Sequence, residues 1–104
     1  MVVRTSEIRN FLKRVQKKFS PSKIILFGSR ARGDYLLESD YDLIIVSDAF
    51  KKYDFTERIG QVMRLSDGSV SLDIICYTEE EFEKKKKEIG TVQEAVKEGV
   101  LLKV

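Results

Sequence analysis

Two short apolar runs enclose a stretch that is dense in glycine, arginine and acid. The first, Lys23-Ile-Ile-Leu-Phe27, leads directly into a Gly-Ser pair, and the second is Tyr41-Asp-Leu-Ile-Ile-Val46. Their length and β-branched content predict two strands, the second apolar enough to be covered on both faces. The charged residues between them must therefore lie beside the core. They form either an ordinary surface loop that carries charged side chains or a site that binds phosphate and metal.

The rest of the chain alternates helical and strand patterns. Apolar residues at helical spacing predict a helix over 6–19, which Ser20-Pro21-Ser22 ends. Further helices are predicted from 54, from 78 through Glu88 and from 91 to near Gly99, each opening on a capping-box pattern. A third strand is predicted over 70–77, after an Asp-Gly turn, and a terminal strand over 100–104. This order predicts an α/β (α+β) fold, a small mixed sheet flanked by helices.

Composition narrows the class of protein. The 104 residues are expected to form a single domain over 1–104, and 42% of them are hydrophobic and 35% charged, which is a globular balance. No apolar run approaches the roughly 20 residues needed to cross a bilayer. The single cysteine, Cys76, has apolar neighbours and is expected to be a buried thiol, so we expect a cytoplasmic protein with no membrane partner.

Two further features of composition bear on function. The chain contains no histidine, which excludes an imidazole base, a Ser-His-Asp triad and the usual zinc sites. The formal net charge of +2 is too small to indicate nucleic-acid binding by itself. The run Lys84-Lys-Lys-Lys87 is expected to be a solvated helix face rather than a nucleic-acid surface.

Three aspartates have the spacing of a metal site. Asp40 and Asp42 stand two residues apart at the start of a strand, so their carboxylates are expected on the same side. Asp73 stands inside the third predicted strand, where an unpaired acid would be costly. The arrangement that best explains it places this strand beside the second, with Asp73 facing the other two. Their mutual repulsion calls for a proton or a cation, and a pair of Mg²⁺ ions meets that need with hard oxygen ligands.

The Gly-Ser turn is expected to bind phosphate. Gly28 at the end of a strand allows the backbone to approach a ligand, and Ser29 adds a hydroxyl donor where a helix opens. Arg30 and Arg32 are near enough to add charge-assisted bonds. The glycine spacing imitates a P-loop, but the required Lys and Ser/Thr do not follow Gly33.

Together these motifs resemble the DNA polymerase β-type nucleotidyltransferase superfamily. The fuller pattern, Phe27-Gly-Ser-Arg-Ala-Arg-Gly33 with Ser39-Asp-Tyr-Asp-Leu43, resembles its shortest branch, the minimal nucleotidyltransferases found beside HEPN-domain toxins. The length and the ending Glu98-Gly-Val-Leu-Leu102 are also similar, so the likeness covers nearly the whole chain. It implies a polymerase β-like fold.

The resemblance also implies roles. Asp40 and Asp42 would bind two Mg²⁺ ions, Asp73 would complete the site and help to deprotonate the acceptor, and Ser29 would contact the terminal phosphates of ATP. The reaction would be transfer of AMP to a hydroxyl, with release of pyrophosphate. The implied acceptor is a tyrosine of a partner HEPN toxin, which would make this chain an adenylylating, type VII-like antitoxin.

Other readings stay open on the sequence. The Asp-x-Asp pair could be solvated turn acids, Asp73 a buried acid satisfied by a lysine, and the two arginines ordinary surface charges. Asp34 and Glu38 are expected to be exposed loop acids. In function, the chain could be a catalytically idle antitoxin that neutralises its toxin by binding, or an enzyme that extends RNA using the lysine run.

Overall fold

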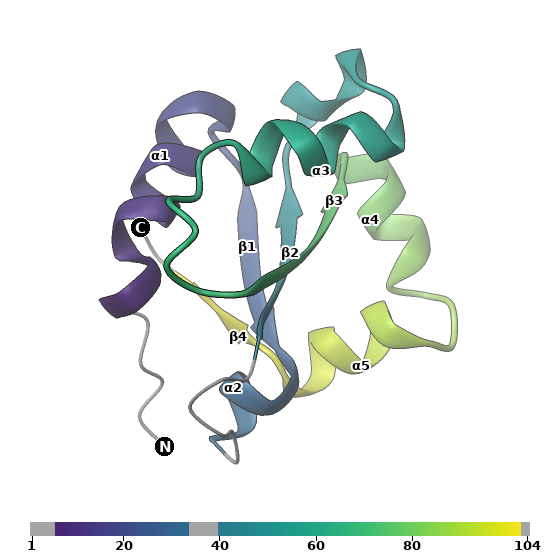
Figure 1. Cartoon of the computed structure of the whole chain (residues 1–104). Helices are drawn as coiled ribbons and strands as arrows, with labels where there is room; N and C mark the ends of the chain where they lie inside the picture. Colours follow the sequence, from purple (N-terminus) through teal and green to yellow (C-terminus); the bar gives the residue numbers. More distant parts are fainter. Residues whose placement is uncertain (1–5, 34–39, 103–104) are drawn as a thin grey trace.

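The computed structural model describes residues 6–33 and 40–102. Four strands pair into one mixed sheet in the order β3-β2-β1-β4: β1 (Lys23–Phe27), β2 (Tyr41–Val46), β3 (Leu72–Tyr77) and β4 (Val100–Leu101). β1 is antiparallel to β2 and to β4, whereas β2 and β3 are parallel and are joined by a crossover. Figure 1 shows this sheet at the centre of the fold.

The helices complete the element order. They are η1 (Ser6–Ile8), α1 (Arg9–Phe19), α2 (Gly28–Arg32), η2 (Asp48–Lys52), α3 (Phe55–Met63), α4 (Glu79–Lys85) and α5 (Thr91–Glu98), where η denotes a 3-10 helix. The predicted α/β fold, with a small mixed sheet flanked by helices, is confirmed. No helix in the described ranges is long and apolar enough to cross a membrane.

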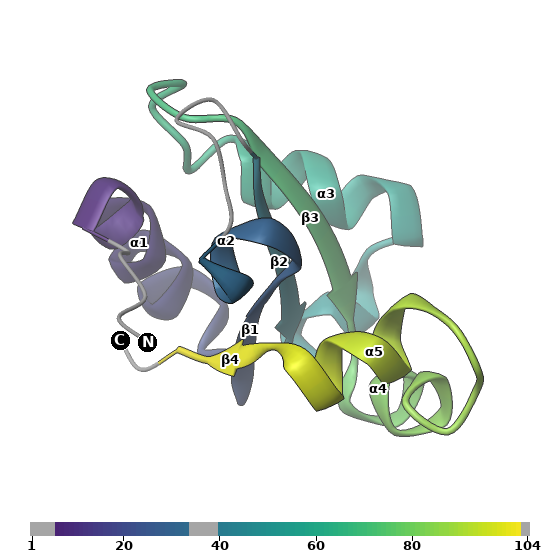
Figure 2. The ribbon, with the colours of Figure 1, turned by 90° about the horizontal axis from the view of Figure 1, so that it is seen from below.

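The two faces of the sheet are covered by different helices. Alternate residues of each strand, such as Leu26, Leu43 and Ile74, pack with α1, η2 and α3 into one buried cluster. The intervening residues, such as Ile25 and Ile44, pack with α4 and α5 into a second. In Figure 2, α1 lies on one side of the sheet and α4 with α5 on the other. β2 is therefore covered on both faces, as its continuous apolar sequence predicts.

Local sequence signals explain most element ends. Capping boxes open α3, with Asp54 and Glu57, and α4, with Thr78 and Glu81. α1 ends where Ser20 adopts a left-handed conformation, with φ of 44°. The third predicted capping box is wrong: α5 begins at Thr91 itself, and no side chain caps it.

Several boundaries also differ from the prediction. β3 begins at Leu72 rather than at 70, and α4 ends at Lys85 rather than at Glu88. The short helix η2 was not predicted; the Ser47 hydroxyl accepts a hydrogen bond from the Ala49 amide and caps it. Of the terminal strand predicted over 100–104, β4 covers the first two residues, and 103–104 lie outside the described residues.

Candidate active site

One row of side chains crosses three strands at one end of the sheet. Phe27 pairs with Asp42 in the antiparallel register of β1 and β2, and Asp42 pairs with Asp73 in the parallel register of β2 and β3. Register partners project to the same face of a sheet, so both acids lie on the face that α4 and α5 cover further along. The prediction that the third strand lies beside the second is confirmed, and of the two acids that Asp73 was expected to face, Asp42 is its register partner.

The electrostatics of this row centre on Asp42. Its pKa is raised above the ordinary value by partial burial first, then by the negative charges of Asp73 and Asp40. Asp40 is exposed and stands immediately before β2. The positive charge of Arg32 acts in the opposite direction and favours the ionised form of Asp42. The three acids therefore interact with one another, and a cation here would relieve their repulsion.

Asp73 is not the buried acid that the sequence suggested. It is exposed, because it is the second residue of β3 and β3 lies at the edge of the sheet. The alternative reading, in which Asp73 is buried and paired with a lysine, therefore does not apply, because it requires a buried Asp73. An exposed carboxylate beside a half-buried one remains free to take up a metal or a proton.

Gly28 holds the turn from β1 into α2 directly against Asp42. Its φ is +72°, a left-handed conformation that side chains rarely adopt, and a Cβ here would overlap the Asp42 carboxylate. Only glycine permits both the turn and this close approach. Ser29 follows as the next residue of α2 and is half-buried, so the predicted Gly-Ser turn lies beside the acids.

The two arginines of α2 lie on different sides. Arg30 is buried, and its guanidinium stacks over the ring of Tyr41, 4.3 Å from the centroid. Tyr41 belongs to the cluster on the α1 face and donates a hydrogen bond of 2.6 Å from its hydroxyl to Glu7. Arg30 therefore packs against β2 on the α1 side of the sheet, and its contact with phosphate stays a prediction. Arg32 is exposed and lies on the side of the acids.

The donors at the acidic row suit a hard cation. They are all carboxylate oxygens, which Mg²⁺ prefers, and Mg²⁺ usually takes one or two protein carboxylates together with phosphate oxygens and water. Within residues 6–33 and 40–102, no three acidic, histidine or cysteine side chains are already gathered into a metal site. The row therefore fits a metal that arrives with a phosphate-bearing substrate rather than one held by the protein alone.

Sequence reasoning overlooked one residue of the row. Phe27 was treated as a strand residue and as part of the family motif but was given no role in the site, yet it is the register partner of Asp42 and is only partly buried. Its proximity could not be read from the sequence because it depends on the β1–β2 register. Asp34 and Glu38, predicted as exposed loop acids, lie outside the described residues.

Comparison with known proteins agrees with this geometry. Residues 8–103 match the family described as "Nucleotidyltransferase domain". The chain belongs to this family. It is 40% identical over 80 residues to a protein of Methanocaldococcus jannaschii named "Putative protein adenylyltransferase", covering 75% of this chain and 77% of that protein.

Solved structures show the same fold. A "putative nucleotidyltransferase" from Sulfolobus solfataricus is 32% identical, with a TM-score of 0.61 over 88% of this chain and 71% of that one. The BolA domain of SufE1 from Arabidopsis thaliana is 23% identical, with a TM-score of 0.56 over 75% of this chain and 98% of that one. The second likeness concerns the fold alone, so the acids and the Gly-Ser turn, rather than the architecture, carry the functional argument.

Proposed function

We propose that this nucleotidyltransferase moves AMP from ATP onto a hydroxyl group of a partner protein. The observation that carries the proposal is the pairing of Asp42 with Asp73 across two strands, directly against the Gly28 turn. The name of the Methanocaldococcus relative supports protein adenylylation in particular. The resemblance to minimal nucleotidyltransferases supports a tyrosine of a HEPN-domain toxin as the acceptor and an antitoxin role for this chain.

Asp40, Asp42 and Asp73 would hold two Mg²⁺ ions together with the phosphates of ATP. When bound, these ions neutralise phosphate charge and stabilise the oxygens that attack and leave. The fit rests on the donor chemistry and on the repulsion of Asp42 by Asp73 and Asp40, which adds to the effect of burial in raising the pKa of Asp42. Ser29 would donate from its hydroxyl to the terminal phosphates, and Arg32 would add a charge-assisted bond.

The transfer itself is a single displacement at phosphorus. The acceptor oxygen forms a bond to the α-phosphorus, and the bond from that phosphorus to the oxygen bridging to the β-phosphorus breaks. Pyrophosphate leaves with the electron pair of that bond. The proton of the acceptor hydroxyl passes to Asp73, whose exposed carboxylate lies on the open edge strand. Positioning and electrostatics supply most of the rate in such reactions.

The test is transfer of label from α-labelled ATP to a HEPN-domain protein, the proposed acceptor, in the presence of Mg²⁺. We expect the toxin to retain label with the wild type and to lose it with Asp42→Asn or Asp73→Asn. Asp67→Asn is the matched control, because Asp67 is an exposed turn acid bonded to the Ser69 amide. Labelling that survives both active-site substitutions would contradict the proposal.

The same variants separate the enzyme from an idle antitoxin. If the toxin stays neutralised by Asp42→Asn and carries no label, binding alone explains the antitoxin activity. If neutralisation and label disappear together, the transfer is what silences the toxin. A well-folded variant, checked by its unfolding midpoint, is required for either conclusion.

A further inference from the structure

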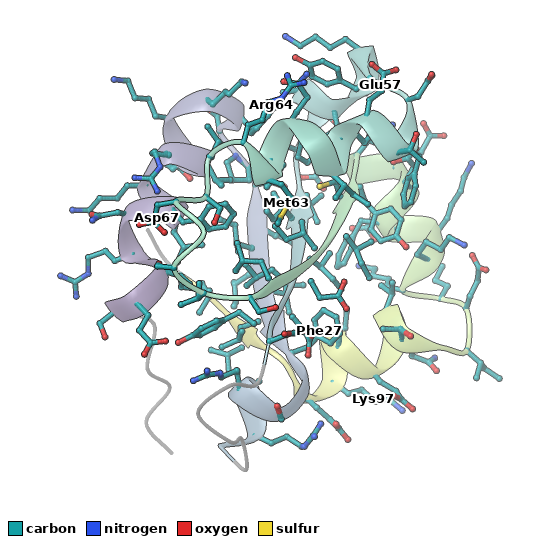
Figure 3. The ribbon with its side chains drawn as sticks, in the orientation of Figure 1. Phe27, Glu57, Met63, Arg64, Asp67 and Lys97 are labelled. Carbon is teal, nitrogen blue, oxygen red and sulfur yellow. The ribbon has the colours of Figure 1, made fainter. Side chains whose placement is uncertain are left out.

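We infer that the hollow between α2 and α5 binds the base of the nucleotide and selects one that carries an exocyclic amino group. This inference rests on the proposed function and adds the substrate preference of that site. The hollow measures about 120 Å³ and is bounded by Phe27, Gly28 and Arg32 on one side and by α5 on the other. Figure 3 labels Phe27 at the end of β1, near α5.

The hollow is continuous with the acidic row. Gly28 lines it and also lies against the Asp42 carboxylate, and Phe27 is the register partner of Asp42. A ligand in the hollow is therefore adjacent to the position proposed for the phosphates. At about 120 Å³ it is smaller than typical pockets for whole ligands, which measure roughly 300–1,000 Å³. It has room for one part of a nucleotide only.

The charges of the hollow decide which part that is. Glu94 and Glu98 lie one turn apart on α5 and both line it. The two carboxylates outnumber the single guanidinium of Arg32, which lies on the side of the acids, so the hollow would repel a triphosphate and suits the uncharged end of the nucleotide. The partly buried Phe27 ring offers an apolar surface on which a base can stack.

The same carboxylates discriminate among bases. An ionised carboxylate only accepts hydrogen bonds, so it can pair with the amino group of adenine and has nothing to offer a carbonyl oxygen at the same position. A base without that amino group forms no such bond and leaves the carboxylate to water. The hollow should therefore prefer adenine to unsubstituted purine, which differs from it only by lacking the amino group.

The experiment compares binding of ATP and of purine riboside triphosphate, each with Mg²⁺, by calorimetry. We expect the wild type to bind ATP about tenfold more tightly, the effect of one charge-assisted hydrogen bond. In Glu94→Ala/Glu98→Ala the two affinities should become equal, because alanine keeps the helix and removes both acceptors. Glu80→Ala, which removes an exposed acid on α4, is the matched control and should keep the preference.

A second substitution tests the stacking surface. Phe27→Leu keeps an apolar side chain, so it should weaken both nucleotides by a similar factor and leave their ratio unchanged. Equal affinities in the wild type, or a preference that survives the double substitution, would overturn the inference.

The outcomes also separate this inference from the proposed function. Equal affinities accompanied by transfer that depends on Asp42 would overturn only the assignment of the base. If the wild type binds neither nucleotide, the proposed function fails and the inference fails with it.

Discussion

At the scale of single residues, Gly28 is required for two reasons, the conformation of its own backbone and its contact with an acid of the candidate site. Its positive φ makes the turn into α2, and its missing side chain makes room for the Asp42 carboxylate. Gly68 shares the first property but not the second, since its φ is +80° and a Cβ at this position would meet no neighbouring atom within 4 Å. The chain therefore contains its own control for separating backbone strain from crowding.

We predict that Gly28→Ala costs more than Gly68→Ala in both stability and transfer. A left-handed conformation costs a non-glycine residue about 1–3 kcal/mol, which both variants should show in urea unfolding. Gly28→Ala must also displace Asp42, so its transfer rate should fall about a hundredfold, whereas Gly68→Ala should keep normal transfer. Equal transfer rates for the two variants would contradict the close contact described above.

Cys76 gives a second prediction at this scale. It is fully buried in β3, and burial raises the pKa of its thiol to about 12. Only the thiolate reacts readily, so the native protein should be inert to Ellman's reagent at pH 8 and should react at once in denaturant. Rapid labelling without denaturant would mean that β3 opens locally, since a core strand normally opens only on global unfolding.

The different positions of the two arginines of α2 could not be predicted from the sequence. Both follow the Gly-Ser pair and both carry the same charge, so the sequence offered no reason to treat them differently. The phase of a five-residue helix places Arg30 over the Tyr41 ring and Arg32 towards the acids. By contrast, the pairing of Asp42 with Asp73 was predicted correctly, although one of its two grounds, the cost of burying Asp73, was wrong because Asp73 is exposed.

At the scale of elements, one buried arginine ties α3 to α4. Arg58 donates to the carbonyl oxygens of Phe50 and Tyr53 and forms an ion pair of 2.6 Å with Glu81. Glu81 also accepts from the Thr78 amide in the capping box of α4. This pair therefore fixes the start of α4 against α3 and the segment that follows β2.

We predict that Glu81→Gln lowers the free energy of unfolding by about 1 kcal/mol at pH 7, a modest value because the Glu81 side chain is 41% exposed. Glutamine can still serve the capping box, so the change removes the charge alone. Glu80→Gln is the control; its pair with Lys84 is exposed and should contribute little.

The same pair makes a prediction about pH. The hydrogen bond from Arg58 lowers the pKa of Glu81 below its ordinary value of 4.5, so its contribution is complete above that value and is lost as the pH falls through the lowered pKa. The difference in unfolding free energy between the wild type and Glu81→Gln should therefore shrink with acidification below 4.5. A difference that stays constant in acid would exclude the ion pair as its cause.

Elements were predicted best where a cap or a period marked them. The capping boxes of α3 and α4 and the short continuous apolar runs of β1 and β2 gave correct elements. η2 escaped prediction because Asp48–Lys52 carries no helical period and is held by a single hydroxyl cap and the burial of Phe50. Such short turns are determined by tertiary packing rather than by local preference.

At the scale of the whole molecule, charge is evenly compensated. Three lysines of the basic run pair with glutamates on or next to α4: Lys84 with Glu80, Lys85 with Glu88 and Lys86 with Glu83. The run is therefore a mixed-charge surface, as the sequence analysis expected, and the net charge of the chain is only +2.

We predict that single-stranded RNA binds negligibly at about 150 mM salt, since the lysines have little uncompensated charge to offer phosphates. The triple variant Glu80→Gln/Glu83→Gln/Glu88→Gln should bind measurably at low salt, which would identify the glutamates as the cause. Filter binding across a salt series measures both. Tight, salt-sensitive binding of RNA by the wild type would instead support the alternative that the chain is an enzyme that extends RNA.

The crossover between β2 and β3 has a consequence for synthesis of the protein. Residues 47–71 must be synthesised before β3 can pair with β2, and only then do Asp42 and Asp73 meet. A chain still emerging from the ribosome, or one terminated early within α3, carries the glycine turn, Asp40 and Asp42 but not Asp73. Premature translation products should therefore have no transfer activity at all. The pair of acids on β2 and β3 forms only when β3 joins the sheet as its edge strand.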